Sequence, residues 1–322
     1  MSAVVFAYHD VGCMALRVLR RLGVDIRAVY THADDPEENK WFGSVTRTCQ
    51  ELGLDVRVGV DPNTPEEIER IRALKPSVFF SVYYRDLLKS PLLALPTHGG
   101  VNLHGSLLPR YRGRAPVNWQ ILNGETQGGV TLHYMVTKPD AGDIVDQEAF
   151  EIGPDDTGVD VYERMLPAAE RVLERSAIAV MEGIAPRTRQ VPSKVSTFGR
   201  RRPADGMIDW RWAAEDVRNL IRAVTKPYPG AFAFAGDTRV LVWGARHEVL
   251  PASADPRARF TALDREPGRI YRERDGLYVA CGDRRRLKLT CIEIDGAESD
   301  GTTPIAALQN CLAFSSQPIE GL

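Results

Sequence analysis

The first half of the chain alternates short, continuously apolar runs with longer stretches in which apolar residues recur at helical spacing. Apolar runs of this length, without an alternating polar face, predict strands that are buried on both faces. Strands separated by helices pair in parallel, so the pattern predicts an α/β fold with a Rossmann-like, mostly parallel sheet and helices on both faces. The predicted strands are Ala3–Tyr8, Ile26–Tyr30, Asp55–Val58, Val78–Tyr84, Gly100–Leu103, Val130–Met135 and Ile144–Phe150.

The strand ends of this predicted sheet indicate where a ligand would bind. In open α/β sheets, ligands bind outside the carboxyl ends of the strands, so we expect the residues after Tyr84 and after Leu103 to line the site. Gly12 and Gly23 are typical of turns and are too sparse for a phosphate-binding loop. The predicted helices are Met14–Leu22, Val45–Leu52, Glu66–Leu74 and Val159–Met181.

The character of the sequence changes near residue 190, where basic, polar, Pro and Gly residues become frequent. Beyond this segment a helix at Ala213–Ala223 precedes short strand-like runs separated by turns, which predict a small β-rich, OB-like barrel. The predicted strands of this barrel are Gly230–Phe234, Thr238–Trp243, Gly268–Tyr271, Leu277–Cys281 and Leu287–Ile294. We therefore expect a catalytic domain at 1–190, a linker at 191–209, a β-rich domain at 210–305 and a tail at 306–322.

The composition argues against several classes of function. A net charge of -2 gives no general electrostatic reason to bind nucleic acid or an anionic membrane. The five cysteines are scattered, without a CxxC pair or a Cys/His cluster at metal-ligand spacing, so we expect free thiols, a reduced compartment and no metal. The N-terminal segment lacks a basic region, and no apolar stretch is long enough to span a bilayer. We expect a cytoplasmic protein.

The densest chemical signal is the pair Asn102 and His104, at the end of the predicted strand Gly100–Leu103. Alternate residues of a strand face the same side, so both side chains should point into one site. Acyl transfer to an amine needs a group that moves protons near neutral pH and a donor to the developing oxyanion, and imidazole and amide groups supply these. Asp140 lies in a loop after another apolar strand, and its carboxylate would raise the pKa of a neighbouring imidazole.

Each of these signals also has a purely structural interpretation. A single histidine is more often a core residue bonded to a backbone carbonyl, and Asp140 could cap a turn with Gly142. Tyr83 and Tyr84 are more typical of packing, and Arg110 and Arg112 of a solvated basic strip. We give the structural interpretation to the histidines that lack polar company, with His9, followed by Asp10, as a partial exception that could line the cleft. These histidines are His9, His32, His98, His133 and His247.

The motif around His104 resembles a known family. Asn-Leu-His-Gly-Ser-Leu-Leu-Pro at 102–109, Tyr-Arg-Gly-Arg-Ala-Pro at 111–116 and Lys-Pro-Asp-Ala-Gly at 138–142 are similar to the folate-dependent formyltransferases. That family includes methionyl-tRNA, glycinamide ribonucleotide and sugar formyltransferases. The strongest resemblance is to the formyltransferase domain of the bifunctional polymyxin-resistance enzyme, which formylates UDP-4-amino-4-deoxy-L-arabinose, although its decarboxylase domain has no counterpart in this sequence. Further similar segments are 4–10, 83–85, 118–119, 198–201 and 229–232.

The resemblance implies a role for each site residue. His104 would be the general acid/base, Asn102 the donor to the oxyanion or formyl oxygen, and Asp140 the partner that raises the pKa of His104. The co-substrate would be 10-formyltetrahydrofolate, which is consumed in each turnover. Its pocket would be formed by Asp86, Leu87, Leu88, Arg114, Val136, Thr137, Lys138 and Pro139, and the nucleotide sugar would contact Asn118 and Arg201.

The sequence leaves three functions open. The first is formyl transfer to a nucleotide-linked 4-amino sugar, the second is formylation of methionyl-tRNA, and the third is a non-catalytic relative that has kept the fold. The transfer-RNA enzymes resemble one another in a longer, basic insertion after the second strand, which would suit a phosphate backbone. We therefore expect a nucleotide sugar and no nucleic acid as the partner, with the sugar and the oligomeric state undetermined. The corresponding loop here carries Asp34, Asp35, Glu37 and Glu38 against Lys40.

Overall fold

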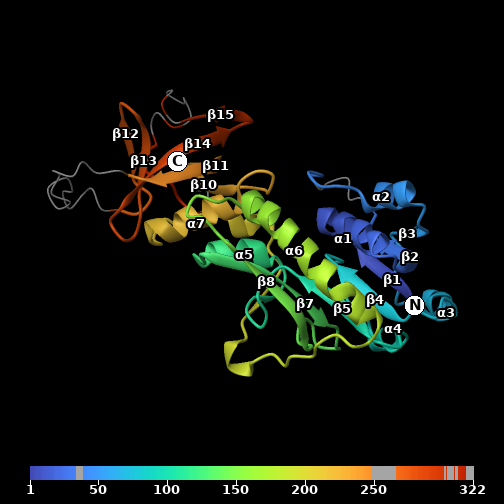
Figure 1. Cartoon of the computed structure of the whole chain (residues 1–322). Helices are drawn as coiled ribbons and strands as arrows, with labels where there is room; N and C mark the ends of the chain where they lie inside the picture. Colours follow the sequence, from blue (N-terminus) through green and yellow to red (C-terminus); the bar gives the residue numbers. More distant parts are fainter. Residues whose placement is uncertain (34–38, 249–265, 301, 303–307, 309–310, 317–322) are drawn as a thin grey trace. The chain divides into compact units, whose positions relative to one another are not determined.

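The computed structural model separates the described residues into two compact units (Figure 1). The dividing line falls inside two helices, so short segments of the first half of the chain belong to the second unit. The first unit consists of Met1–Val117, Thr126–Ile152 and Asp160–Arg200, and the second of Asn118–Glu125, Gly153–Val159 and Arg201–Leu322. Described residues are 1–33, 39–248, 266–300, 302, 308 and 311–316, so the acidic residues 34–38 and most of 306–322 lie outside them.

The first unit is built on a sheet with the strand order β3-β2-β1-β4-β5-β7-β8. Neighbouring strands from β3 to β5 are parallel, whereas β7 is antiparallel to both β5 and β8. The prediction of a mostly parallel α/β sheet is confirmed, and its antiparallel side is a new feature. The strands are β3 (Val56–Val58), β2 (Asp25–Thr31), β1 (Ser2–Ala7), β4 (Val78–Val82), β5 (Gly100–His104), β7 (Gln127–Tyr134) and β8 (Ile144–Glu151).

Helices cover both faces of this sheet. Neighbouring residues of β1 point to opposite faces, and each contacts a different set of helices. Phe6 packs with Ile71 of α3 and Leu92 of α4 in one apolar cluster. Ala7 faces the other side, where it meets Gly12 of α1. No helix among the described residues combines the length and the apolarity needed to cross a bilayer. The helices are α1 (His9–Arg21), α2 (Val45–Leu52), α3 (Pro65–Ala73), α4 (Ser90–Leu93), α5 (Pro116–Leu122), α6 (Gly158–Met181) and α7 (Ala214–Val224).

Helix α1 corrects two sequence-based expectations. It begins at His9, well before the predicted start at Met14, so Gly12 lies inside the helix and not in a turn. A Cβ atom on Gly12 would lie 3.1 Å from the Cβ of Ala7 and 3.2 Å from Cγ2 of Val45. The missing side chain of Gly12 therefore lets α1 pack closely against β1, and it does not serve a turn. Gly23, with φ 74°, does lie in a turn.

The second unit contains an antiparallel sheet with the strand order β10-β11-β14-β13-β12, and β15 pairs with β14. This confirms an antiparallel, β-rich C-terminal domain, and the OB-like comparison stays a prediction. Residues 311–316, which the sequence assigns to a tail, bond to both edges: Ser315 pairs with Phe234 of β10, and Ala313 pairs with Arg269 beside β12. The strands are β10 (Ala231–Ala235), β11 (Thr238–His247), β12 (Ile270–Glu273), β13 (Gly276–Ala280), β14 (Arg286–Ile294) and β15 (Ala297–Ser299).

The segment predicted to be a linker contains regular structure. Two short 3₁₀ helices, Pro192–Lys194 and Pro203–Gly206, flank the strand β9 (Thr197–Phe198). Strand β9 pairs in parallel with β6 (Arg112–Gly113), which lies in the loop after β5. The part of the linker up to residue 200 therefore belongs to the first unit and braces the loop that follows His104.

His9 lies in an aromatic cluster that joins α1 to α6. Its ring stacks on Phe42 at a centroid distance of 3.8 Å and lies edge-on to Trp41 at 4.9 Å. Its Nδ1 hydrogen-bonds the hydroxyl of Tyr162 on α6. Burial, together with the smaller effect of the positive charge of Arg85, lowers the pKa of His9 to about 3. His9 is therefore a buried, uncharged core histidine at neutral pH.

Acid should destabilise the parent protein more steeply than the variant His9→Gln. Between pH 6.5 and about 3, the unfolded imidazole binds a proton that the folded one does not. In this window His9 therefore lowers the free energy of unfolding by about 1 kcal/mol for each pH unit of acidification. Urea unfolding at several pH values measures the slope for both proteins. Equal slopes would mean that folded His9 charges as freely as unfolded His9.

Candidate functional site

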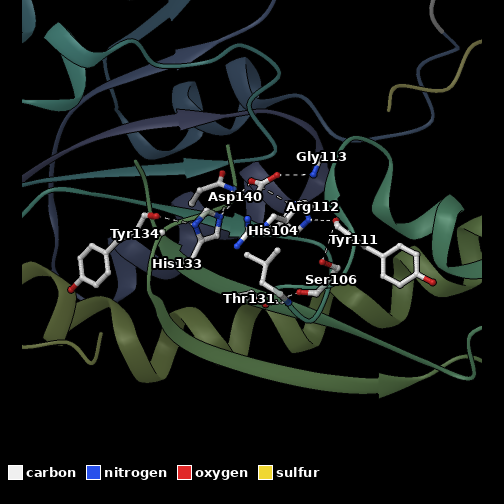
Figure 2. Close-up of polar contacts among 12 residues, drawn as sticks. His104, Ser106, Tyr111, Arg112, Gly113, Thr131, His133, Tyr134 and Asp140 are labelled. Atoms are coloured by element: carbon white, nitrogen blue, oxygen red, sulfur yellow. Dashed lines mark hydrogen bonds and ion pairs between the residues drawn. The ribbon is translucent and has the colours of Figure 1, made fainter. Parts of the chain in front are cut away.

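The structure brings His104 and Asp140 together at the carboxyl end of β5 (Figure 2). Asn102 lies against His133, which is close to the same carboxylate. Strand β5 supplies Asn102 and His104 two residues apart, and His104 is its last residue. The ring of His104 is buried, and Asn102 is half-buried. This strand lies between parallel β4 and antiparallel β7, so side chains from both neighbours reach the same face.

Asp140 places one carboxylate oxygen between two imidazole rings. Its Oδ1 lies 3.7 Å from Nδ1 of His104 and 3.6 Å from Nε2 of His133. The second oxygen, Oδ2, accepts a hydrogen bond of 2.8 Å from the backbone N–H of Gly113. The carboxylate thus bonds to the loop after β5 (Figure 2). The sequence alone suggests only a local turn cap with Gly142 as the structural role of Asp140.

Gln190 fixes the backbone that carries Asp140. Asp140 itself has a φ of 52°, a left-handed conformation that a non-glycine residue adopts only when its surroundings hold it there. The Nε2 of Gln190 donates to the carbonyls of Asp140 at 2.8 Å and of Gly142 at 2.7 Å. Its Oε1 accepts from Nε and Nη2 of Arg112, at 3.1 and 2.6 Å. One amide therefore joins the Asp140 loop to the strand after Tyr111.

The protonation of His104 follows from its partners. Its Nε2 lies 2.8 Å from the carbonyl oxygen of Tyr111, and since a carbonyl only accepts, Nε2 carries the hydrogen. Burial lowers the pKa of His104, and this outweighs the nearby Asp140 and the Tyr111 carbonyl, which act to raise it. Asp140 does act to raise the pKa of His104, as the sequence predicts, but burial has the larger effect, so the pKa is lowered overall. The ring is therefore neutral at neutral pH, with the lone pair of Nδ1 toward Asp140.

Asp140 stays ionised in the same environment. Burial acts to raise its pKa, but the positive charge of His104 once that ring is protonated, the contact with His133 and the N–H of Gly113 outweigh burial and hold that pKa well below its usual range. A buried carboxylate without such partners would take up a proton instead. The site therefore contains a fixed negative charge beside a neutral base.

A hydrogen-bond network holds the loop between His104 and Tyr111 in place (Figure 2). The hydroxyl of Thr131 on β7 donates to the carbonyl of Ser106 at 2.6 Å and accepts from the backbone N–H of Leu108 at 3.0 Å. Gln147 on β8 donates to that hydroxyl at 2.8 Å and to the carbonyl of Leu108 at 2.9 Å. The antiparallel strands thereby determine where the carbonyl of Tyr111 meets His104.

His133 is the site residue that the sequence analysis missed. It was assigned a structural role, yet it stands directly opposite Asn102 across the β5–β7 pair and lies against Asp140. Residues opposite one another in an antiparallel pair have adjacent side chains. The sequence shows His133 inside an apolar strand, which marks it as unusual. Only the register of β7 against β5 shows that His133 faces Asn102.

The residues proposed for the folate pocket are largely exposed. Asp86 and Leu87 follow β4 in a segment that Asn63 braces, by donating to the carbonyl of Leu87 and accepting from the N–H of Lys89. The guanidinium of Arg114 donates to the carbonyl of Arg85, so Arg114 lies against this segment. The other predicted residues are Leu88, which is half-buried, and Val136, Thr137, Lys138 and Pro139, which are exposed in the loop that leads to Asp140.

The two residues assigned to the nucleotide sugar lie in the second unit. The amide of Asn118 is buried and donates to the carbonyl of Ala223 at 2.7 Å. The guanidinium of Arg201 donates to the carbonyl of Asp205 at 2.7 Å and lies 5.0 Å from the centre of the Trp119 ring. Asn118 therefore already has a backbone partner, while the half-buried Arg201 keeps further donors for a ligand; contact of both residues with the nucleotide sugar stays a prediction.

The chemistry of the site is that of proton transfer next to a fixed charge. Within the part of the chain that the structure describes, no group of His, Cys, Asp and Glu side chains is arranged to hold a metal ion. A neutral imidazole beside an ionised carboxylate can take a proton from an attacking amine and pass it on. An adjacent amide can donate to an oxygen that gains negative charge.

Removing the amide of Gln190 should loosen the loop of Asp140. We expect Gln190→Ala to lower the free energy of unfolding by about 2 to 3 kcal/mol, because the carbonyls of Asp140 and Gly142 and the guanidinium of Arg112 lose their partner. Gln127→Ala, at an exposed glutamine, should change it by less than about 0.5 kcal/mol. Urea denaturation measures both. A loss at Gln190 no larger than that at Gln127 would contradict the bracing role.

Family models match both halves of the chain. The model described as formyl transferase matches residues 13–176, and the model described as formyl transferase, C-terminal domain, matches residues 201–308. The first match alone covers more than half of the sequence and includes Asn102, His104, His133 and Asp140. The boundary between the two matches is close to the division between the two compact units.

Several solved structures share this fold at low sequence identity. An N-formyltransferase from Helicobacter canadensis, in complex with folinic acid and dTDP-3-aminofucose, has a TM-score of 0.68 and 19% identity over 90% of this chain and 98% of its own. The sugar 3N-formyltransferase WlaRD, with dTDP and 5-N-formyl-THF, has a TM-score of 0.67 and 17% identity over 92% and 98%. Methionyl-tRNA formyltransferase from Clostridium thermocellum has a TM-score of 0.51 and 15% identity over 79% and 96%.

Proposed function

The chain belongs to the formyl transferase family, and we propose that it transfers a formyl group from 10-formyltetrahydrofolate to the amine of a nucleotide-linked 4-amino sugar. The observation that carries this proposal is the cluster of Asn102, His104 and Asp140 around a neutral buried imidazole. A non-catalytic protein would not need the neutral imidazole of His104 beside the ionised carboxylate of Asp140, so this arrangement argues against the non-catalytic alternative. We further propose that the enzyme works in the cytoplasm.

In the proposed reaction the amine attacks the formyl carbon, and Nδ1 of His104 takes a proton from it as the new C–N bond forms. The imidazolium that results is stabilised by Asp140, which lies 3.7 Å away. Asn102 donates an N–H to the oxyanion of the tetrahedral intermediate. His104 then returns the proton to N10 of the folate as the bond from carbon to N10 breaks. The products are the formamide and tetrahydrofolate.

The donor side of the site is proposed from the resemblance and from the position of its residues. Folate compounds are present in the H. canadensis and WlaRD structures, which share the fold of this chain. We assign the pterin to the backbone of Asp86, Leu87 and Leu88, and the rest of the pocket to Arg114 and residues 136–139. The contact of Arg114 with Arg85 supports this assignment, because it joins two of the proposed segments. The donor acts as a co-substrate, and no step in the scheme requires a metal.

The acceptor side is the least constrained part of the proposal. The sequence resembles the formyltransferase domain that acts on UDP-4-amino-4-deoxy-L-arabinose, whereas the H. canadensis and WlaRD structures contain a dTDP-linked sugar or dTDP. We propose a UDP-linked 4-amino sugar, with Arg201 as a contact to the nucleotide. Transfer to methionyl-tRNA is the alternative, and the acidic residues 34–38 disfavour a phosphate backbone.

A substrate screen tests this proposal directly. We expect the protein to release tetrahydrofolate from 10-formyltetrahydrofolate when a UDP-linked 4-amino sugar is present, and not with initiator methionyl-tRNA. The variant His104→Ala should still bind the folate but should lose transfer by about a hundredfold or more. Absorbance of the folate follows turnover, and calorimetry follows binding. Turnover with transfer RNA alone, or undiminished turnover in His104→Ala, would overturn the proposal.

Replacing Asp140 by Asn should shift the acid limb of the pH–rate profile to lower pH. Asp140 raises the pKa of His104, so the neutral amide leaves that pKa lower still, and the base stays unprotonated further into acid. At the same time kcat should fall by about a hundredfold, because the imidazolium loses its counter-charge. Measurement of kcat/KM across pH checks both effects. A pH–rate profile identical to that of the parent would show that Asp140 does not influence the pKa of His104.

A further inference from the structure

We propose that His133 is a positioning residue that fixes the orientation of the Asn102 amide, so that an N–H of Asn102 stays available to the formyl oxygen. This inference rests on the proposed function and assigns a role in the same site to a histidine that the sequence analysis treated as core packing. The geometry behind it is a chain of contacts from the Tyr134 carbonyl through His133 to Asn102. Figure 2 shows His133 between Tyr134 and Asp140.

The backbone determines which nitrogen of His133 carries the hydrogen. Its Nδ1 lies 2.9 Å from the carbonyl oxygen of Tyr134. A carbonyl oxygen only accepts, so Nδ1 donates, and a ring with a single hydrogen then presents a lone pair at Nε2. The side chain is 2% exposed, so water does not replace this partner. His133 is held in the Nδ1–H tautomer.

The lone pair at Nε2 in turn determines the orientation of Asn102. Nδ2 of Asn102 lies 3.2 Å from Nε2 of His133, so one N–H of the amide donates to the ring. The second N–H of the same nitrogen is then free to donate to an oxyanion. The flipped amide would place its oxygen against the lone pair of His133, which is repulsive, and would offer a carbonyl to the developing negative charge. Only one of the two amide orientations is compatible with both neighbours.

Among the residues that the structure describes, the carboxylate of Asp140 and the ring of His104 lie near His133. Oδ1 of Asp140 lies 3.6 Å from Nε2 and would favour a hydrogen on that nitrogen. This contact is longer than the 2.9 Å between Nδ1 and the Tyr134 carbonyl, which lies within the normal hydrogen-bond range. The ring of His104 lies 6.4 Å away, edge to face, and is neutral. The shorter contact therefore sets the tautomer.

A set of substitutions separates positioning from packing. An asparagine at 133 can keep the donor near Nδ1 but loses the acceptor at Nε2, while glutamine can place an acceptor near Nε2. We expect His133→Asn to lower kcat by about tenfold to a hundredfold, with KM for the folate changed by less than about twofold. His133→Gln should recover kcat to within about threefold of the parent. His247→Asn, at a histidine of the second unit outside the site, is the control and should leave kcat unchanged.

A double-mutant cycle with Asn102→Ala tests whether His133 acts through Asn102. In that background, His133→Asn should lower kcat by less than about twofold further, because the amide to be oriented is gone. A purely structural histidine would cost the same with and without Asn102. An additive cycle, or failure of His133→Gln to recover more activity than His133→Asn, would overturn the inference.

The tautomer itself can be measured without any substrate or variant. In protein with ¹⁵N-labelled histidine, long-range ¹H–¹⁵N spectra should show a protonated Nδ1 and an unprotonated Nε2 for His133. A hydrogen on Nε2 would refute the inference even if every variant proved too unstable to assay. Because this measurement needs no acceptor, it also distinguishes a failure of the inference from a failure of the proposed function. If the chain formylates nothing tested, the tautomer still reports on the orientation of Asn102.

Discussion

The site depends on one buried carboxylate that remains charged. Asp140 lies against two imidazole rings and accepts a hydrogen bond from a backbone N–H, and each of these groups comes from a different part of the first unit. His104 comes from β5, His133 from β7 and Gly113 from the loop braced by β9. The carboxylate therefore joins the end of β5, the loop that follows it and β7. In the proposed reaction, His104 is therefore neutral before it takes up a proton and is paired with Asp140 afterwards.

The fold could be predicted where a local pattern determines the structure. Short apolar runs such as Val78–Val82 are recognisable as buried strands, and the predictions of a mostly parallel α/β sheet and of a β-rich C-terminal domain are confirmed. The antiparallel direction of β7 could not be predicted from the sequence, because parallel and antiparallel buried strands have the same apolar pattern. The start of α1 was missed because Gly12 suggested a turn, whereas the structure uses it for a close approach to Ala7.

The same distinction applies to the site. Asn102 and His104 are two residues apart on one strand, so their common direction follows from strand geometry alone. Gln190 and His133 are different, because their roles depend on partners far away in sequence: Asp140 and Arg112 for the former, Asn102 for the latter. No spacing rule links such residues. Their roles depend on strand register and on loop conformation, which a single sequence does not encode in any short window.

The pairing of residues 311–316 with both edges of the second sheet has a consequence for biosynthesis. Until this late segment has left the ribosome, the backbone groups of Phe234 on β10 and of Arg269 beside β12 lack the partners that it supplies. The first unit, by contrast, has all of its residues by position 200. A translating ribosome would therefore carry a first unit with all of its residues while both edges of the second sheet still lack partners, and those edges would be open to chaperones or to another nascent chain.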